Sequence, residues 1–114
     1  MQLKPTEHQI QKAILDYLKA RKILAWRQNA GGFVIKEGNK TRYIKTGIAG
    51  LPDIAVMLPY GIMLFLEVKN EKGKLSERQK EFFEKARELG HYCEVVRSID
   101  DVEKILSNLT KLKK

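Results

Sequence analysis

Residues 52–69 read PDIAVMLPYGIMLFLEVK, and this stretch decides the fold. Two apolar runs, 54–58 and 62–69, are typical of strands, and the Pro-Tyr-Gly between them predicts a turn. In an antiparallel hairpin that is symmetric about this turn, Asp53 lies opposite Glu67, with β carbons about 4.5–5.5 Å apart. The stretch therefore predicts a central hairpin with two carboxylates opposed at its open end.

Two opposed carboxylates destabilise a sheet unless a positive charge lies between them. A divalent cation supplies that charge, and carboxylate oxygens favour Mg²⁺ or Mn²⁺. Zinc fits poorly, because the chain has only one cysteine and two histidines. Since side chains alternate along a strand, Lys69 points to the same face as Glu67. An acid pair beside a lysine, in a basic protein, indicates metal-assisted hydrolysis of phosphodiester bonds.

The sequence on either side of the hairpin predicts helices packed on a sheet. Capping boxes at Thr6-x-x-Gln9 and Ser76-x-x-Gln79 each begin an amphipathic helix, and Gly90 ends the second one. In chain order we expect a helix from Thr6, short strands over 23–27, 33–36 and 42–46, the hairpin, the helix from Ser76, a strand over 92–96 and a helix from Ser98. This order predicts one α/β domain over residues 1–114, with a central mixed β-sheet flanked by helices.

Charge is distributed unevenly along the 114 residues, whose formal net charge is +8. Residues 1–52 carry 10 Lys or Arg against 3 Asp or Glu, whereas residues 53–109 carry 9 against 11. A basic half favours a polyanionic partner such as nucleic acid. No run is long and apolar enough to span a bilayer, so we expect no membrane partner, and we expect no organic cofactor either. The single cysteine, Cys93, favours a reducing cytoplasm, and it is predicted to be a core residue together with Trp26.

These motifs resemble those of the virus-type replication–repair nuclease (VRR-NUC) family, which lies within the PD-(D/E)XK nuclease superfamily. The residues that carry the superfamily signature are Pro52-Asp53 and Glu67-Val68-Lys69. Further matching pieces are Glu7, Trp26-Arg27-x-Asn29 with Gly31-Gly32, Gly47-x-x-Gly50, Gly73-Lys74-Leu75-Ser76-x-x-Gln79, and Gly90 with Val96-Arg97-Ser98. The resemblance runs from Glu7 to about Leu106 and implies a restriction-endonuclease-like core with the order α-βββ-ββ-α-β-α.

The resemblance also implies roles for single residues. Asp53 and Glu67 are expected to hold the metal together with the backbone carbonyl of Val68, and Lys69 is expected to be the catalytic lysine. Glu7 is expected to border the metal site as a possible further ligand. A carboxylate in a first helical turn also suits the helix dipole without any ligand, so both interpretations of Glu7 remain open.

Gln79 has two interpretations that do not exclude each other. It is the third residue of the capping box behind Ser76, and the family places a glutamine at this point beside the site. We therefore include Gln79 among the candidate catalytic residues.

Polar and basic residues on both sides of the hairpin are candidate DNA contacts, although solvated surface charge remains the alternative. The candidates are Arg27, Asn29, Lys36, Arg42, Lys45, Lys72 and Lys74.

The function predicted from these residues is that of a Mg²⁺- or Mn²⁺-dependent DNA endonuclease. The resemblance implies a homodimer that cuts branched DNA such as four-way (Holliday) junctions during replication, repair or recombination, in the cytoplasm of a bacterium or a phage-infected cell. Two symmetric cuts need two active sites, which suits a homodimer. Two alternatives remain open at this point: a non-catalytic basic DNA-binding module on the same fold, and a restriction-type endonuclease that cuts duplex DNA.

Overall fold

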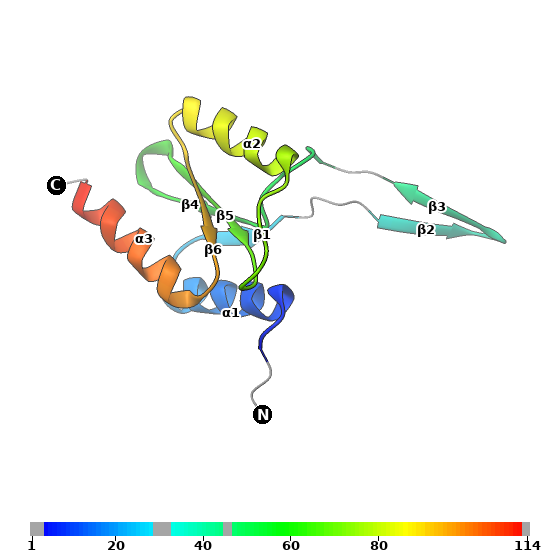
Figure 1. Ribbon diagram of the computed structural model, residues 1–114, viewed down its shortest axis with the longest axis horizontal. Helices are drawn as coiled ribbons and strands as arrows, with labels where there is room; N and C mark the ends of the chain where they lie inside the picture. The colour runs from blue at the N-terminus through cyan, green and yellow to red at the C-terminus, as the bar shows by residue number, and fades with distance from the viewer. Residues whose placement is uncertain (1–3, 29–32, 45–46, 113–114) are drawn as a thin grey trace.

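A computed structural model describes residues 4–28, 33–44 and 47–112, so the candidate contacts Asn29 and Lys45 lie outside the described residues (Figure 1). Its elements are α1 (Glu7–Ala20), β1 (Ala25–Arg27), β2 (Phe33–Glu37), β3 (Lys40–Ile44), β4 (Ile54–Met57), the 3-10 turn η1 (Pro59–Gly61), β5 (Met63–Val68), α2 (Glu77–Glu88), β6 (Tyr92–Val96) and α3 (Ile99–Leu112). This order and the mixed sheet confirm the predicted α/β fold class.

The central sheet has four strands in the order β1-β4-β5-β6. Strand β4 runs antiparallel to both β1 and β5, whereas β5 and β6 are parallel and are joined by α2 as a βαβ crossover. The register of the central hairpin pairs Ile54 with Leu66 and Met57 with Met63, as the symmetric turn predicted. The next pair outward in this register is Asp53 with Glu67.

Side-chain alternation in the strands separates two hydrophobic clusters. Even-numbered residues of the central strands, such as Leu64 and Leu66, pack in the main core with α1 and α3. Odd-numbered residues, such as Phe65 and Cys93, pack with α2. In Figure 1, α1 and α3 lie on one side of the sheet and α2 lies on the other. Glu67 is odd-numbered, so its side chain belongs to the face that α2 covers.

Both predicted capping boxes are present. The Thr6 hydroxyl accepts from the backbone N–H of Gln9, and the Gln9 side chain accepts from the N–H of Thr6. Ser76 and Gln79 form the same pair of bonds at the start of α2. These local bonds fix where each helix begins, and α1 then buries an apolar stripe against the sheet.

Two features of the fold differ from the sequence-based expectation. Strands β2 and β3 form a separate two-stranded sheet, which projects from the body of the molecule instead of extending the central sheet (Figure 1). The prediction that Trp26 is a core residue is wrong, because its side chain is 39% exposed on the edge strand β1. Cys93 is buried, as predicted. None of the helices in the described ranges could cross a membrane, since none is long and apolar enough.

Candidate active site

Glu67 is the only charged residue among the buried side chains of the described ranges, with 3% of its surface exposed. It lies near the end of β5, on the face that packs against α2. Its Oε2 atom accepts a hydrogen bond from Gln79 Nε2 at 3.1 Å and lies 3.5 Å from Lys69 Nζ. Its Oε1 atom is buried without a hydrogen-bond partner. A buried carboxylate oxygen without a partner is costly, so this position favours a cation.

Asp53 lies just before β4 and is fixed by both its backbone and its side chain. Its Oδ2 atom accepts from the backbone N–H of Val68 at 2.8 Å, and its carbonyl accepts from the backbone N–H of Gln28 at 2.8 Å. The Gln28 side chain also donates to the carbonyl of Pro52 at 3.1 Å. The aspartate is therefore attached to the end of β5 on one side and to the end of β1 on the other.

The carboxylates of Asp53 and Glu67 repel each other, and the positive charge of the nearby Lys69 does not cancel this repulsion. Burial, the charge of Asp53 and a hydrogen bond with Asp53 together raise the pKa of Glu67 from its ordinary 4.5 to about 8. The nearby Lys69 lowers this pKa but does not offset the other effects. A bound cation would relieve the repulsion that a proton otherwise relieves. The donor set of two carboxylates fits Mg²⁺ or Mn²⁺, which are often bound by one or two carboxylates with waters and phosphates completing the shell.

Gln79 acts at two places at once. Its Oε1 atom accepts from the backbone N–H of Ser76 at 2.8 Å, which completes the cap of α2. Its Nε2 atom donates to Glu67. The two interpretations of Gln79 thus coexist in one side chain, because the amide presents an acceptor to the helix terminus and a donor to the carboxylate.

Gly50 brings the Asp53 loop and the start of α2 together. Its φ is +77°, and a β carbon there would lie 2.3 Å from the carbonyl oxygen of Arg78. Only glycine allows this close approach of two backbones. The contact explains why Asp53, which follows this loop, and Gln79, which follows Arg78, both reach Glu67.

Glu7 does not form a cluster of three potential metal ligands with Asp53 and Glu67. Its Oε2 atom accepts from the backbone N–H of Asn70 at 3.1 Å, directly after Lys69 in the chain. In the described part of the molecule, no three His, Cys, Asp or Glu side chains come close enough to hold a metal together. The role of Glu7 as a metal ligand thus remains a prediction, whereas its contact with the backbone next to Lys69 is part of the structure.

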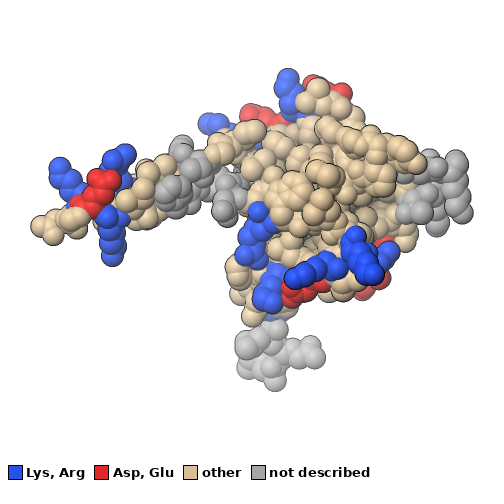
Figure 2. All heavy atoms as spheres, turned by 180° about the vertical axis from the view of Figure 1, so that it is seen from behind, with Lys and Arg blue, Asp and Glu red and all other residues tan. Residues whose placement is uncertain are grey.

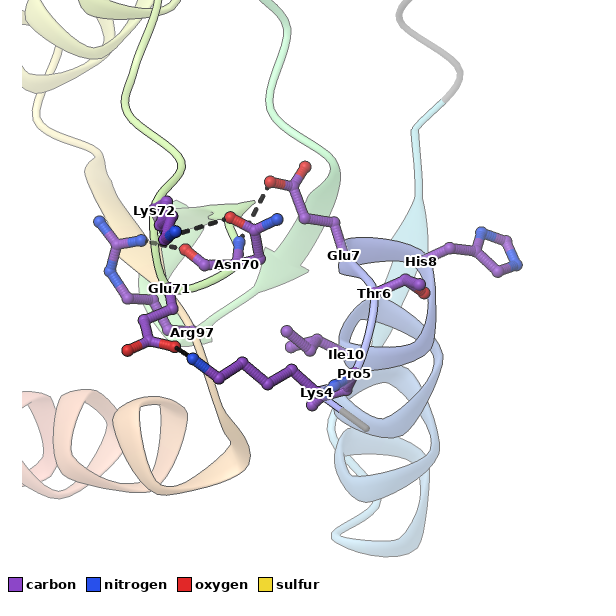
Figure 3. A pocket seen from close by; sticks show the side chains of 10 residues that line it. All are labelled: Lys4, Pro5, Thr6, Glu7, His8, Ile10, Asn70, Glu71, Lys72 and Arg97. Carbon is purple, nitrogen blue, oxygen red and sulfur yellow. Dashed lines mark hydrogen bonds and ion pairs between the residues drawn. The ribbon is translucent and has the colours of Figure 1, made fainter. Parts of the chain in front are cut away.

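Sequence reasoning assigned no role to Arg97, which holds the loop that follows Lys69. Arg97 Nη1 donates to the carbonyl of Asn70 and, at 3.1 Å, to that of Gly73. The Asn70 side chain accepts from the backbone N–H groups of Lys72 and Gly73 at 3.1 and 2.9 Å. Figure 3 shows Glu7 and Arg97 on opposite sides of Asn70. The signal available in the sequence was Arg97 itself, in the Val96-Arg97-Ser98 piece of the resemblance.

This loop and the start of α1 line a cleft of about 1030 Å³ (Figure 3). An ion pair of 2.6 Å between Lys4 and Glu71 joins its two sides. Lys72 and Arg97 also line it. Asn70, which directly follows Lys69 in the chain, lines this cleft, whereas Asp53 and Glu67 do not.

The remaining candidate DNA contacts lie on exposed parts of three elements. Arg27 is exposed at the end of β1, where it pairs with Ile54, next to Asp53. Lys36 and Arg42 are exposed on β2 and β3, and the loop between β5 and α2 carries the exposed Lys72 and Lys74.

Comparison with known proteins gives a consistent assignment. A family model described as the VRR-NUC domain matches residues 5–100. One solved structure, described as a VRR_NUC domain, is 26% identical with a TM-score of 0.61, covering 90% of this chain and 97% of the other. A second, described as a VRR_NUC domain protein, is 21% identical with a TM-score of 0.63, covering 96% and 92%. Among curated proteins, no relative matches.

Proposed function

The chain belongs to the VRR-NUC domain family, a family of nuclease domains, and on this premise we propose that it is a Mg²⁺- or Mn²⁺-dependent DNA endonuclease. The observation that carries the proposal is the pairing of the buried Glu67, which has one unpartnered oxygen, with Asp53 and with a lysine 3.5 Å away. An acid pair with one buried carboxylate destabilises the fold unless it serves to bind a cation. Cation binding therefore explains the presence of Asp53 and Glu67 at this place better than a contribution to stability does.

Asp53, Glu67 and the Val68 carbonyl are the groups that would hold the cation. When bound, it supplies positive charge to the scissile phosphate and a water of lowered pKa. Lys69 donates hydrogen bonds from Nζ to the attacking water or to the phosphate oxygens as their charge grows. Gln79 keeps the Glu67 carboxylate in one orientation, and the bond from Val68 N–H does the same for Asp53. Fixed orientation matters here, because the catalytic advantage of a preorganised site is lost when its ligands must be ordered during the reaction.

We further propose that the substrate is branched DNA, such as a four-way junction, and that the active form is a homodimer with two sites for two symmetric cuts. The basic first half of the chain and the exposed Arg27, which pairs with Ile54 next to Asp53, support DNA as the substrate. A role in replication, repair or recombination, in the cytoplasm of a bacterium or a phage-infected cell, fits that substrate.

The test is cleavage of end-labelled four-way junctions, flaps and linear duplexes in Mg²⁺, Mn²⁺ or EDTA. We expect cutting only with the metals, and most rapidly on the branched substrates. Asp53→Ala and Lys69→Ala should each reduce the single-turnover rate by at least about 100-fold while binding to the junction persists. Asp100→Ala and Lys104→Ala remove the same charges from exposed positions on α3 and should cut normally.

Equal cutting by the wild type and Lys69→Ala would contradict the mechanism. Binding without any cutting would favour the non-catalytic DNA-binding module. Rapid cutting of linear duplex at one sequence would favour the restriction-type enzyme.

A further inference from the structure

The separate sheet formed by β2 and β3, here called the arm (residues 33–44), has no structural role in the core. It forms its own two-stranded sheet, turns at Gly38, whose φ is +60°, and projects from the body (Figure 1). The molecule accordingly measures 59 Å along its longest axis and 43 and 27 Å along the others. An isolated two-stranded hairpin is marginally stable in water. A partner that covers such a hairpin would therefore stabilise it.

The charge of the arm indicates what that partner is. Lys36, Lys40 and Arg42 are all exposed, and the only acidic residue of the arm is Glu37. Figure 2 shows these charges gathered at the outer end of the arm. Glu37 lies 3.7 Å from Arg42 in an exposed ion pair, which contributes little and leaves the guanidinium available to a stronger anion. The arm therefore favours a polyanion.

Both ends of the arm lead to the acid pair. On the N-terminal side, β1 ends at Arg27 and the next residue, Gln28, donates its backbone N–H to the carbonyl of Asp53. On the C-terminal side, the chain passes through Gly50 directly into Asp53. The arm is therefore joined at both ends to segments of the chain that lead to Asp53.

We propose that the arm is a basic β-ribbon that lies in a groove of the DNA duplex next to the phosphodiester cut at Asp53 and Glu67. The major groove is about 12 Å wide and admits a two-stranded ribbon. Strands of five residues span about 17 Å, which is about half of one helical turn of B-DNA. Lys36, Lys40 and Arg42 contact phosphates along that groove. This inference rests on the proposed function and adds the element that grips the duplex.

The test measures binding to a four-way junction with duplex branches of 30 base pairs. Affinity is measured as a function of salt, and all proteins carry Lys69→Ala so that they do not cut the DNA. The triple variant Lys36→Ala/Lys40→Ala/Arg42→Ala removes three charges from the arm. The matched control, Lys19→Ala/Lys85→Ala/Lys104→Ala, removes three exposed charges from the helices. Each phosphate contact contributes about 0.9 to the slope of log K against log salt, so the arm variant should lose up to about 2.7 of slope and at least about tenfold in affinity near 0.1 M salt.

The control should keep the wild-type slope. With Lys69 restored, the arm variant should cut limiting DNA more slowly than the wild type by the same factor as its loss of affinity, whereas the helix control should cut at the wild-type rate. An unchanged slope and affinity in the arm variant would overturn the inference. Loss of dimers in sedimentation, with an unchanged slope per protomer, would overturn it too and assign the arm to contact between two copies. If the wild type neither binds nor cuts DNA, the proposed function fails instead, and that result is distinct from both.

Discussion

Glu67 is a carboxylate that the fold buries almost completely and leaves with one oxygen unpaired. Removing an ordinary carboxylate from a protein surface changes stability little, but removing this one relieves desolvation and the repulsion from Asp53. The buried carboxylate therefore lowers the free energy of unfolding of the metal-free protein. At the scale of the residue, stability and the proposed metal binding are therefore opposed.

The pKa of Glu67, raised to about 8, makes this opposition depend on pH. A carboxyl whose pKa is higher in the folded state favours folding while it is protonated, and this stability is lost as the pH rises from about 4.5 to 8. In EDTA, the free energy of unfolding of the wild type should therefore fall between pH 5 and pH 8 relative to that of Glu67→Gln. Urea denaturation at several pH values measures the difference. A difference that does not change with pH would contradict the prediction, and Mg²⁺ should stabilise only the wild type at pH 8.

Gln79 allows the cap and the site to be separated experimentally. Ser76→Ala and Gln79→Ala each remove part of the same capping box, so each should lower the free energy of unfolding by about 1 kcal/mol. Only Gln79→Ala also removes the hydrogen bond to Glu67, so only this variant should lower kcat, by about tenfold. Parallel denaturation and single-turnover cleavage test this. Equal rates in the two variants would mean that Gln79 has only a capping role.

Among elements, the contact between the loop before β4 and the start of α2 holds the two halves of the site together. It depends on a glycine at a positive φ whose missing β carbon makes room for the backbone of Arg78. A second contact between distant elements is made by the side chain of Arg97, which donates hydrogen bonds to two carbonyls of the loop after Lys69. Both contacts join elements that are distant in sequence, and both act on the backbone next to a site residue.

Gly50→Ala should therefore be far more harmful than Gly61→Ala. The two glycines have similar φ values, +77° and +72°, so each alanine has a similar backbone strain of about 1–2 kcal/mol. Position 61 has no atom within 4 Å of the added carbon, whereas position 50 has a backbone oxygen at 2.3 Å. We expect Gly50→Ala to lose at least about 2 kcal/mol more of unfolding free energy and most of its cleavage activity. Similar losses in both variants would show that the helix start moves freely away from the loop.

At the scale of the whole molecule, the described residues form a central four-stranded sheet, whose strand β5 carries Glu67 of the acid pair, and an arm that projects from the body. One acid pair makes one cut, so two symmetric cuts in a junction require two copies. Because each copy has a net charge of +8, we expect the binding of the proposed dimer to DNA to weaken as salt is raised.

The proposed homodimer can be tested with mixed dimers of wild type and Lys69→Ala. Such dimers contain one active site, so they should nick a four-way junction on one strand without resolving it into two duplexes. Native gels of a supercoiled cruciform plasmid distinguish the nicked circle from the linear product. Linear product at the wild-type rate would contradict the dimer, and so would a protein mass in the junction complex that corresponds to a single 13.2 kDa chain.

Local patterns in the sequence determined the elements around the site and the pairing of the central hairpin. The capping boxes and the turn at Tyr60 act over a few residues, so their bonds and the register that opposes Asp53 and Glu67 follow from the chain itself. The motif pattern also led to the correct family.

Tertiary structure alone decided which distant groups meet. Strand alternation places Glu67 on one of two faces, but only the packing of α2 on that face buries it and brings Gln79 to it. The same pattern of alternating residues describes a strand inside a sheet and a strand outside it, which is why the arm and the exposure of Trp26 were not foreseen. Local sequence specifies backbone conformation over a few residues, whereas burial, the pKa of Glu67 and the position of the arm depend on contacts between elements that compete for the same faces.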